Sequence, residues 1–89
     1  MAHFLLLYDY PDDVLERRAP HRDEHLALVR TWKDDGRLLL AGAIGDPPNG
    51  GALAFRVDDV GEVEDFVNAD PYVREGVITG HRVEPWNIV

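Results

Sequence analysis

Residues 37–57 read RLLLAGAIGDPPNGGALAFRV, and this segment decides the fold because it encodes two strands joined by a turn. Its first part is an apolar run that ends at Ile44, and residues 46–51 are rich in proline, asparagine and glycine. After this turn, Leu53, Phe55 and Val57 alternate with other residues and so share one face of a strand. The segment therefore predicts a strand over 37–44, a hairpin loop at 46–51 and a strand over 52–57.

A strand and a helix are predicted before this hairpin. Phe4 to Tyr8 form a short apolar run that is followed by acidic residues and Pro11, as is typical of a buried strand. From about Pro20 to Asp35, apolar residues recur at helical spacing, and Gly36 is placed to end the helix.

A second helix, a helical turn and a last strand are predicted after the hairpin. Apolar residues recur at helical spacing over 60–67, and Asp59 and Glu62 have the spacing of a capping box. Asp70-Pro71 is a favourable start for a helical turn over 71–75, and residues 77–86 form the last predicted strand.

The order of these elements is β-α-β-β-α-β, which predicts an α+β fold of the ferredoxin-like type with an antiparallel sheet. No repeat, linker or low-complexity segment interrupts the chain, so one domain over residues 1–89 accounts for it. The first two strands are apolar on both faces, although helices on one side of a sheet cover only one face. We therefore expect a homodimer in which a second copy covers the other face.

Composition limits the classes of partner. Nine basic and seventeen acidic residues give a net charge of −8, which disfavours binding to nucleic acid or to anionic membrane surfaces. The apolar run near residue 4 is too short to span a membrane and lacks the basic lead-in of a signal peptide. There is no cysteine, which excludes disulfides, thiolate metal sites and a thiol nucleophile and is compatible with a reducing compartment. We expect a cytoplasmic protein.

His25 is the first candidate for chemistry. It shares one helical stripe with Leu28, Val29 and Trp32, so a titratable imidazole faces inward. A histidine at such a position acts as a general base in some proteins and is a hydrogen-bonded core residue in others. Spacing does not distinguish these two roles.

Asp70 is the second candidate. An aspartate directly before a proline is a common helix cap, which is a structural role. A carboxylate has two oxygens, however, and capping keeps it ionised, so one oxygen can still orient an imidazole.

One short segment is basic, although the chain as a whole is acidic. It consists of Arg17, Arg18, His21 and Arg22. Such a segment can attract a small anion, but for Arg17 and Arg18 individually a solvated loop paired with nearby acids is the favoured interpretation. Arg22 lies three residues before His25, and its positive charge would favour the neutral imidazole that accepts a proton.

Other signals are weaker. Tyr8, Tyr72, Trp32 and Trp86 could line an aromatic pocket, although aromatic residues at such positions are also common in cores. There is no Gly-rich phosphate loop, dinucleotide motif or nucleophile elbow, and the four histidines have no spacing that predicts a metal site. We therefore expect neither a metal nor a cofactor.

Three stretches of the sequence together resemble the YciI-like (YCII-related) family. They are Arg22-Asp23-Glu24-His25-Leu26, Gly36-Arg37-Leu38-Leu39 followed by Ala41-Gly42, and Asp70-Pro71-Tyr72-Val73 followed by Gly76-Val77. The resemblance implies a ferredoxin-like domain that pairs into a dimeric α/β barrel. It also implies lyase-like acid–base chemistry by a histidine–aspartate pair, at His25 and Asp70, with Arg22 as the arginine that precedes the histidine.

Two departures from the family pattern concern the rim of the expected site. The Gly-Pro that often follows the second strand of the family is Gly42-Ala43 here, and the hairpin at 46–51 is short. We expect both to reshape the mouth of the pocket.

The leading hypothesis is a cofactor-independent, lyase-like enzyme that acts on a small organic molecule, including an anionic one. His25 and Asp70 are its catalytic pair, and Arg22 and Tyr72 contact the substrate. The alternative is a non-catalytic module for small-ligand binding or dimerisation on the same fold, because the fold alone does not prove activity.

Overall fold

The apolar segments of the sequence form one antiparallel sheet in the computed structural model, which describes residues 1–89. The strands are β1 (Ala2–Asp9), β2 (Leu38–Ile44), β3 (Gly50–Val57) and β4 (Gly80–Pro85). Their order across the sheet is β2-β3-β1-β4, and every neighbouring pair is antiparallel. The hairpin therefore supplies one edge strand, β2, and its neighbour β3, as the alternation of apolar residues predicts.

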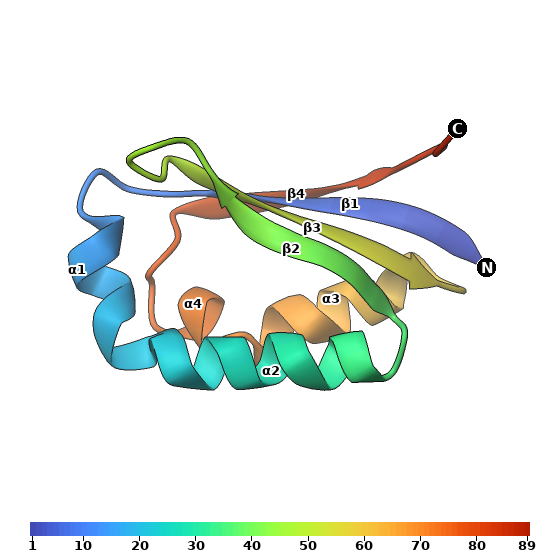
Figure 1. The fold of residues 1–89 in the computed structure, drawn as a ribbon, viewed down its shortest axis with the longest axis horizontal. Helices are drawn as coiled ribbons and strands as arrows, with labels where there is room; N and C mark the ends of the chain where they lie inside the picture. The colour runs from blue at the N-terminus through green and yellow to red at the C-terminus, as the bar shows by residue number, and fades with distance from the viewer.

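The helices lie on one side of this sheet (Figure 1). They are α1 (Val14–Arg18), the 3₁₀ turn η1 (Ala19–His21), α2 (Arg22–Asp34), α3 (Val60–Ala69) and α4 (Pro71–Arg74). The order of the long elements is the predicted β-α-β-β-α-β, so the fold class is α+β. None of the helices combines the length and the apolar character needed to cross a bilayer.

The core lies between the sheet and the helices. Leu6, Leu53 and Phe55 point from the sheet toward Val29 and Trp32 of α2 and toward α3, and all of these side chains are buried. Phe66 of α3 makes edge-to-face contacts with Trp32 and with Phe55, at centroid distances of 5.3 and 5.2 Å. These aromatic contacts fix the height of both helices above the sheet.

The opposite face of the sheet is apolar and uncovered. Leu5 and Leu7 of β1 are part-exposed on it, beside the alanines of β3 and the exposed Leu40 and Ile44 of β2. No element of the chain lies over this face (Figure 1). The apolar character on both faces of the first two strands is therefore present in the structure, as expected.

Several predicted boundaries were wrong. The first long helix begins at Arg22 rather than near Pro20, and the separate helix α1 was not predicted. β3 begins at Gly50, inside the expected hairpin loop. The last strand begins at Gly80 rather than Val77, because Val77 and Ile78 bond to the carbonyl of Tyr72 and are buried beneath the sheet instead of joining it.

The start of α3 differs in detail from the predicted capping box. Asp59 is the N-cap, and its side chain accepts from the backbone N–H of Gly61 at 3.3 Å. Glu62, however, accepts from the N–H of Asp58 at 3.0 Å rather than from that of Asp59. Both side chains still satisfy backbone donors at this helix end.

Replacement of Phe66 by alanine tests the aromatic core. Because Phe66 is fully buried, we expect Phe66→Ala to lower the free energy of unfolding by about 3–5 kcal/mol. The measurement is urea unfolding followed by circular dichroism at one fixed protein concentration. Val60→Ala is the matched control, because Val60 lies on the same helix and is 42% exposed. Equal losses for the two variants would contradict this description of the core.

Candidate functional site

The carboxylate of Asp70 is the centre of a buried hydrogen-bond network. Asp70 has no exposed surface. It lies between α3 and α4 with an extended backbone (φ −76°, ψ 120°), as expected for a residue before proline. Its Oδ1 accepts from the backbone N–H of Tyr72 at 3.0 Å, so Asp70 is the predicted helix cap.

His25 and Asp70, forty-five positions apart in the sequence, meet in space. The imidazole Nδ1 lies 2.8 Å from Asp70 Oδ1. Because a carboxylate only accepts hydrogen bonds, Nδ1 is the donor, which leaves Nε2 of a neutral ring as an acceptor. The His25 side chain is 13% exposed, so the ring is neither sealed in the core nor freely solvated. The contact between the two predicted catalytic residues is therefore present.

Tyr72 holds the other side of the imidazole. Its ring stacks on that of His25, with centroids 3.8 Å apart and planes inclined by 4°. Tyr72 is the second residue of α4, so the cap that binds its N–H also places its ring against His25. Asp70 thus positions the imidazole directly by a hydrogen bond and indirectly through this stack.

Tyr8 completes the network from the sheet. Its hydroxyl donates to Asp70 Oδ2 at 2.7 Å, and both groups are buried. The carboxylate consequently accepts from three donors, which offsets the cost of removing its charge from water. Burial and the charge of Asp70 raise the pKa of Tyr8, so the phenol stays protonated and continues to donate.

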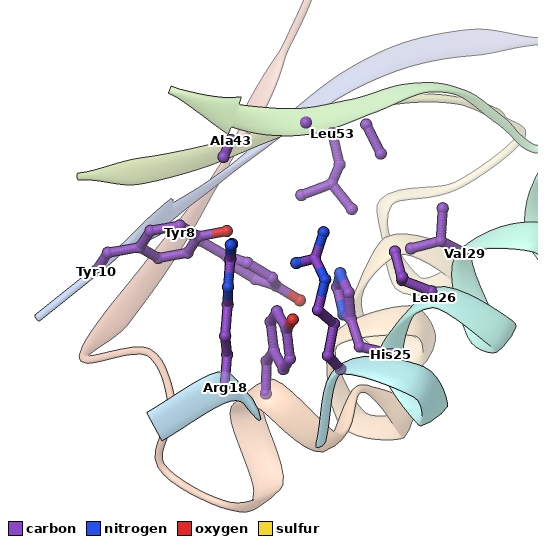
Figure 2. A pocket seen from close by; sticks show the side chains of 12 residues that line it. Tyr8, Tyr10, Arg18, His25, Leu26, Val29, Ala43 and Leu53 are labelled. Carbon is purple, nitrogen blue, oxygen red and sulfur yellow. The ribbon is translucent and has the colours of Figure 1, made fainter. Parts of the chain in front are cut away.

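A cavity of about 200 Å³ opens beside this network (Figure 2). Its polar walls are Tyr8, Tyr10, Arg18, Arg22, His25 and Tyr72, and its apolar walls include Leu26, Val29 and Leu53. Ala41, Gly42 and Ala43 of the edge strand β2 close one side with little side-chain bulk. Three of the four predicted site residues line the cavity, and the fourth, Asp70, lies behind His25.

Two lining residues lie outside the predicted set. We expected Arg18 to belong to a solvated loop, and this was wrong, because it lines the cavity and extends from the end of α1 toward Tyr10 (Figure 2). Tyr10 was not predicted. Phe4, Leu6, Tyr8 and Tyr10 recur at a spacing of two, and this alternation was the signal that would have placed Tyr10 on the same side as Tyr8.

Gly51 makes room for Tyr10. A Cβ atom on Gly51 would lie 2.9 Å from the Tyr10 hydroxyl, which is closer than side chains approach one another. A side chain at this position would therefore displace the Tyr10 hydroxyl from its place at the cavity.

The other aromatic candidates do not reach this cavity. Trp32 belongs to the core, where the guanidinium of Arg37 stacks on its ring at 3.7 Å. Trp86 is 40% exposed near the C-terminus. Arg17 is paired with Asp13 at 2.8 Å on the surface, in agreement with the solvated alternative for that residue. No group of three or more histidine, aspartate or glutamate side chains is placed to hold a metal.

Comparisons with known proteins agree with this fold. A model of the YCII-related domain matches residues 1–87. The chain belongs to the YCII-related family. Protein YciI of Escherichia coli O6:H1 is 34% identical to it over 86 residues, which cover 86% of this chain and 88% of that protein. An uncharacterised protein of Haemophilus influenzae is 30% identical over 98 residues, which cover all of this chain and 99% of that protein.

One solved structure is similar to this member of the YCII-related family over almost its whole length. It is the 5-chloro-2-hydroxyhydroquinone dehydrochlorinase TftG from Burkholderia phenoliruptrix AC1100, in complex with 2,5-dihydroxybenzoquinone. The TM-score is 0.81, the sequence identity is 24%, and the match covers 96% of this chain and 93% of that one. At this level of identity the similarity establishes the fold.

Removal of the Tyr8 hydroxyl tests the buried network. In Tyr8→Phe, Oδ2 of Asp70 would be left buried without its donor, which we expect to lower the free energy of unfolding by about 1–3 kcal/mol. Tyr10→Phe is the matched control, because the Tyr10 hydroxyl makes no hydrogen bond within the chain and its loss should change stability little. Urea unfolding of both variants gives the comparison. A Tyr8→Phe protein as stable as the wild type would show that the carboxylate does not need this donor.

Proposed function

We propose that this protein is a small acid–base enzyme of the lyase-like kind, which acts on a small organic molecule without a cofactor. The proposal rests on one contact, the 2.8 Å hydrogen bond between His25 Nδ1 and Asp70 Oδ1 at the wall of a cavity. In this arrangement Nε2 is the proton acceptor and Asp70 fixes the tautomer that makes it so. The supporting similarity is the fold shared with TftG, because a dehydrochlorinase removes a proton and a chloride from its substrate.

Each residue has a role in the proposed reaction. Nε2 of His25 takes a proton from the substrate, and the electron pair of the broken bond forms a new double bond as a leaving group departs. Asp70 stabilises the imidazolium, which later returns its proton to the leaving group or to water. Tyr72 keeps the ring in plane by stacking, and Arg22 and Tyr72 contact the substrate.

We also propose that two copies of the chain pair through the uncovered face of the sheet, as in a dimeric α/β barrel. Apolar patches of this kind on small proteins are typically interaction surfaces, and a two-fold axis would bury the same patch on both copies. The cavity lies on the opposite, helix-covered side of the sheet, so this pairing leaves it open. The absence of cysteine supports a cytoplasmic place of action for residues 1–89 acting as one domain.

Substitution of the catalytic pair tests the proposed enzyme. In D₂O, the wild-type protein should exchange C–H protons in members of a panel of small carbonyl and phenolic compounds, followed by NMR. Chloride release from 5-chloro-2-hydroxyhydroquinone would be followed in parallel. We expect His25→Ala to lower the rate about 10²- to 10⁴-fold, because the general base is lost. Asp70→Asn should cause a smaller loss, because asparagine still caps α4 but carries no charge to support the imidazolium.

The control is His3→Gln, which alters a histidine at the far end of β1 and should leave the rates unchanged. Circular dichroism checks that all variants are folded. If no compound of the panel reacts, or if His25→Ala reacts as fast as the wild type, the catalytic proposal is wrong. The alternative of a ligand-binding or dimerisation module would then hold.

Sedimentation velocity tests the proposed dimer. The wild-type protein should sediment at about twice the mass of the 10.0 kDa chain at micromolar concentration. Leu40→Glu places a charge on the uncovered face and should shift the protein toward monomer, because Leu40 is 68% exposed there. Leu15→Glu is the control, since Leu15 is 50% exposed on α1, away from this face. A wild-type monomer under these conditions would contradict the proposal.

A further inference from the structure

The polar groups at the mouth of the cavity are nearly all hydrogen-bond donors. Arg18 and Arg22 contribute guanidinium groups, which have no acceptor atom. Neither arginine has a carboxylate within 4.0 Å, whereas Arg17, Arg37 and Arg74 are each paired with an acidic residue. In a chain with a net charge of −8, two unpaired arginines at one cavity are a local positive site.

The hydroxyl of Tyr72 gives a second, independent indication. Tyr72 is 1% exposed and lines the cavity, and its buried hydroxyl has no acceptor for its proton. A buried donor without an acceptor costs stability, and such groups in native proteins are commonly functional. The guanidinium groups of Arg22 and Arg18 lie near this hydroxyl and lower the pKa of Tyr72 against the effect of burial, Arg22 partly by donating to the hydroxyl oxygen, but neither can accept the hydroxyl proton. Only a molecule that brings an acceptor oxygen would satisfy all three groups together.

Both free phenols of the cavity remain donors. Burial raises the pKa of Tyr72 and of Tyr10, and the positive charges of Arg18 and Arg22 only partly oppose this effect. The hydroxyl of Tyr10 also makes no hydrogen bond within the chain. Apart from the phenol oxygens, the side-chain acceptor at the cavity is Nε2 of His25, which takes the substrate proton in the proposed function.

We propose that Arg18, Arg22 and the Tyr72 hydroxyl form a recognition site for an anionic oxygen carried by a small planar molecule. The anionic group is a carboxylate or an ionised phenol or enol, and the planar skeleton packs on Leu26, Val29 and Leu53. An engineered cavity of about 150 Å³ holds benzene, so the cavity of about 200 Å³ has room for one substituted ring. As a statement about the substrate, this inference rests on the proposed function, but anion binding is measurable without turnover.

The same groups would also serve the chemistry. When His25 removes a proton, negative charge develops on the substrate and is delocalised onto an oxygen. Donors that are already in place and do not need to reorganise stabilise this charge most effectively. Arg18 is therefore assigned a role in substrate binding, although the sequence favoured a solvated side chain at this position.

Pairs of charged and uncharged probes test the site by isothermal titration calorimetry. Benzoate should bind at least about 10-fold more tightly than benzamide, which has nearly the same shape without the charge. In a second pair, 4-nitrophenolate is compared with 4-nitroanisole at mildly alkaline pH. Tighter binding of benzoate only indicates a carboxylate substrate, and tighter binding of 4-nitrophenolate only indicates a phenol or enol. Equal binding within both pairs would overturn the anion site.

Arginine substitutions locate the site. Arg18→Gln and Arg22→Gln should each weaken the binding of the preferred anion about 10- to 100-fold and leave its uncharged partner unaffected. Arg30→Gln is the matched control, because Arg30 is exposed on the same helix as Arg22 but does not line the cavity. If Arg30→Gln weakens binding as much as the other two, the anion responds only to overall charge and the assignment fails.

Tyr72→Phe tests whether the Tyr72 hydroxyl serves anion binding or the stability of the fold. Because the buried hydroxyl proton has no acceptor, removal of the hydroxyl should raise the melting temperature by a few degrees and weaken the binding of the preferred anion. A lower melting temperature would mean that the hydroxyl has a structural role instead. His25→Ala should still bind the anion, so the two proposals fail separately. Anion binding without turnover of any compound would refute only the catalytic proposal, and turnover without preference for anions would refute only this one.

Discussion

The buried carboxylate of Asp70 is the constraint on which the arrangement of this molecule depends. An ionised group without exposed surface is tolerated only if hydrogen-bond donors replace water, and here the three donors come from three different parts of the chain. Tyr8 comes from the central strand, His25 from α2 and the Tyr72 N–H from α4. The strand and both helices must therefore be correctly placed before the charge is satisfied, which couples the site to the whole fold.

Local patterns in the sequence account for most of the backbone. Apolar runs bounded by turn residues, alternation in the strand after the hairpin and helical periodicity together predicted the four strands and both long helices. The boundaries were less well predicted where tertiary contacts decide them. Gly50 and Gly51 look like loop residues, yet they pair with β1, and the missing side chain of Gly51 leaves room for the Tyr10 hydroxyl. The helix α1 was not predicted, because its five residues are too few to show a periodic pattern.

The site was only partly predictable for a related reason. The inward stripe of α2 and the Asp-Pro turn, together with the family resemblance, placed His25 near Asp70. The contact of Tyr8 with Asp70 joins residues 62 positions apart, and no spacing rule applies across such a distance. Arg18 and Arg17 are chemically identical neighbours in the sequence, but the turn of α1 directs one toward the cavity and pairs the other with Asp13. Only the folded chain distinguishes them.

The charges around the imidazole are arranged asymmetrically, and this has a consequence for the proposed reaction. The carboxylate of Asp70 lies behind His25, on the side of Nδ1, whereas the guanidinium groups of Arg18 and Arg22 lie at the cavity. Transfer of a proton from a substrate to Nε2 creates positive charge on the ring and negative charge on the substrate. The carboxylate behind the ring stabilises the positive imidazolium, and the arginines at the cavity stabilise the negative substrate. Each product of the transfer is therefore close to a group of opposite charge. A carboxylate at the cavity with arginines behind the ring would oppose the same step. The family fold provides the positions of these residues, and the sign of the charge at each position favours proton transfer from the substrate to His25.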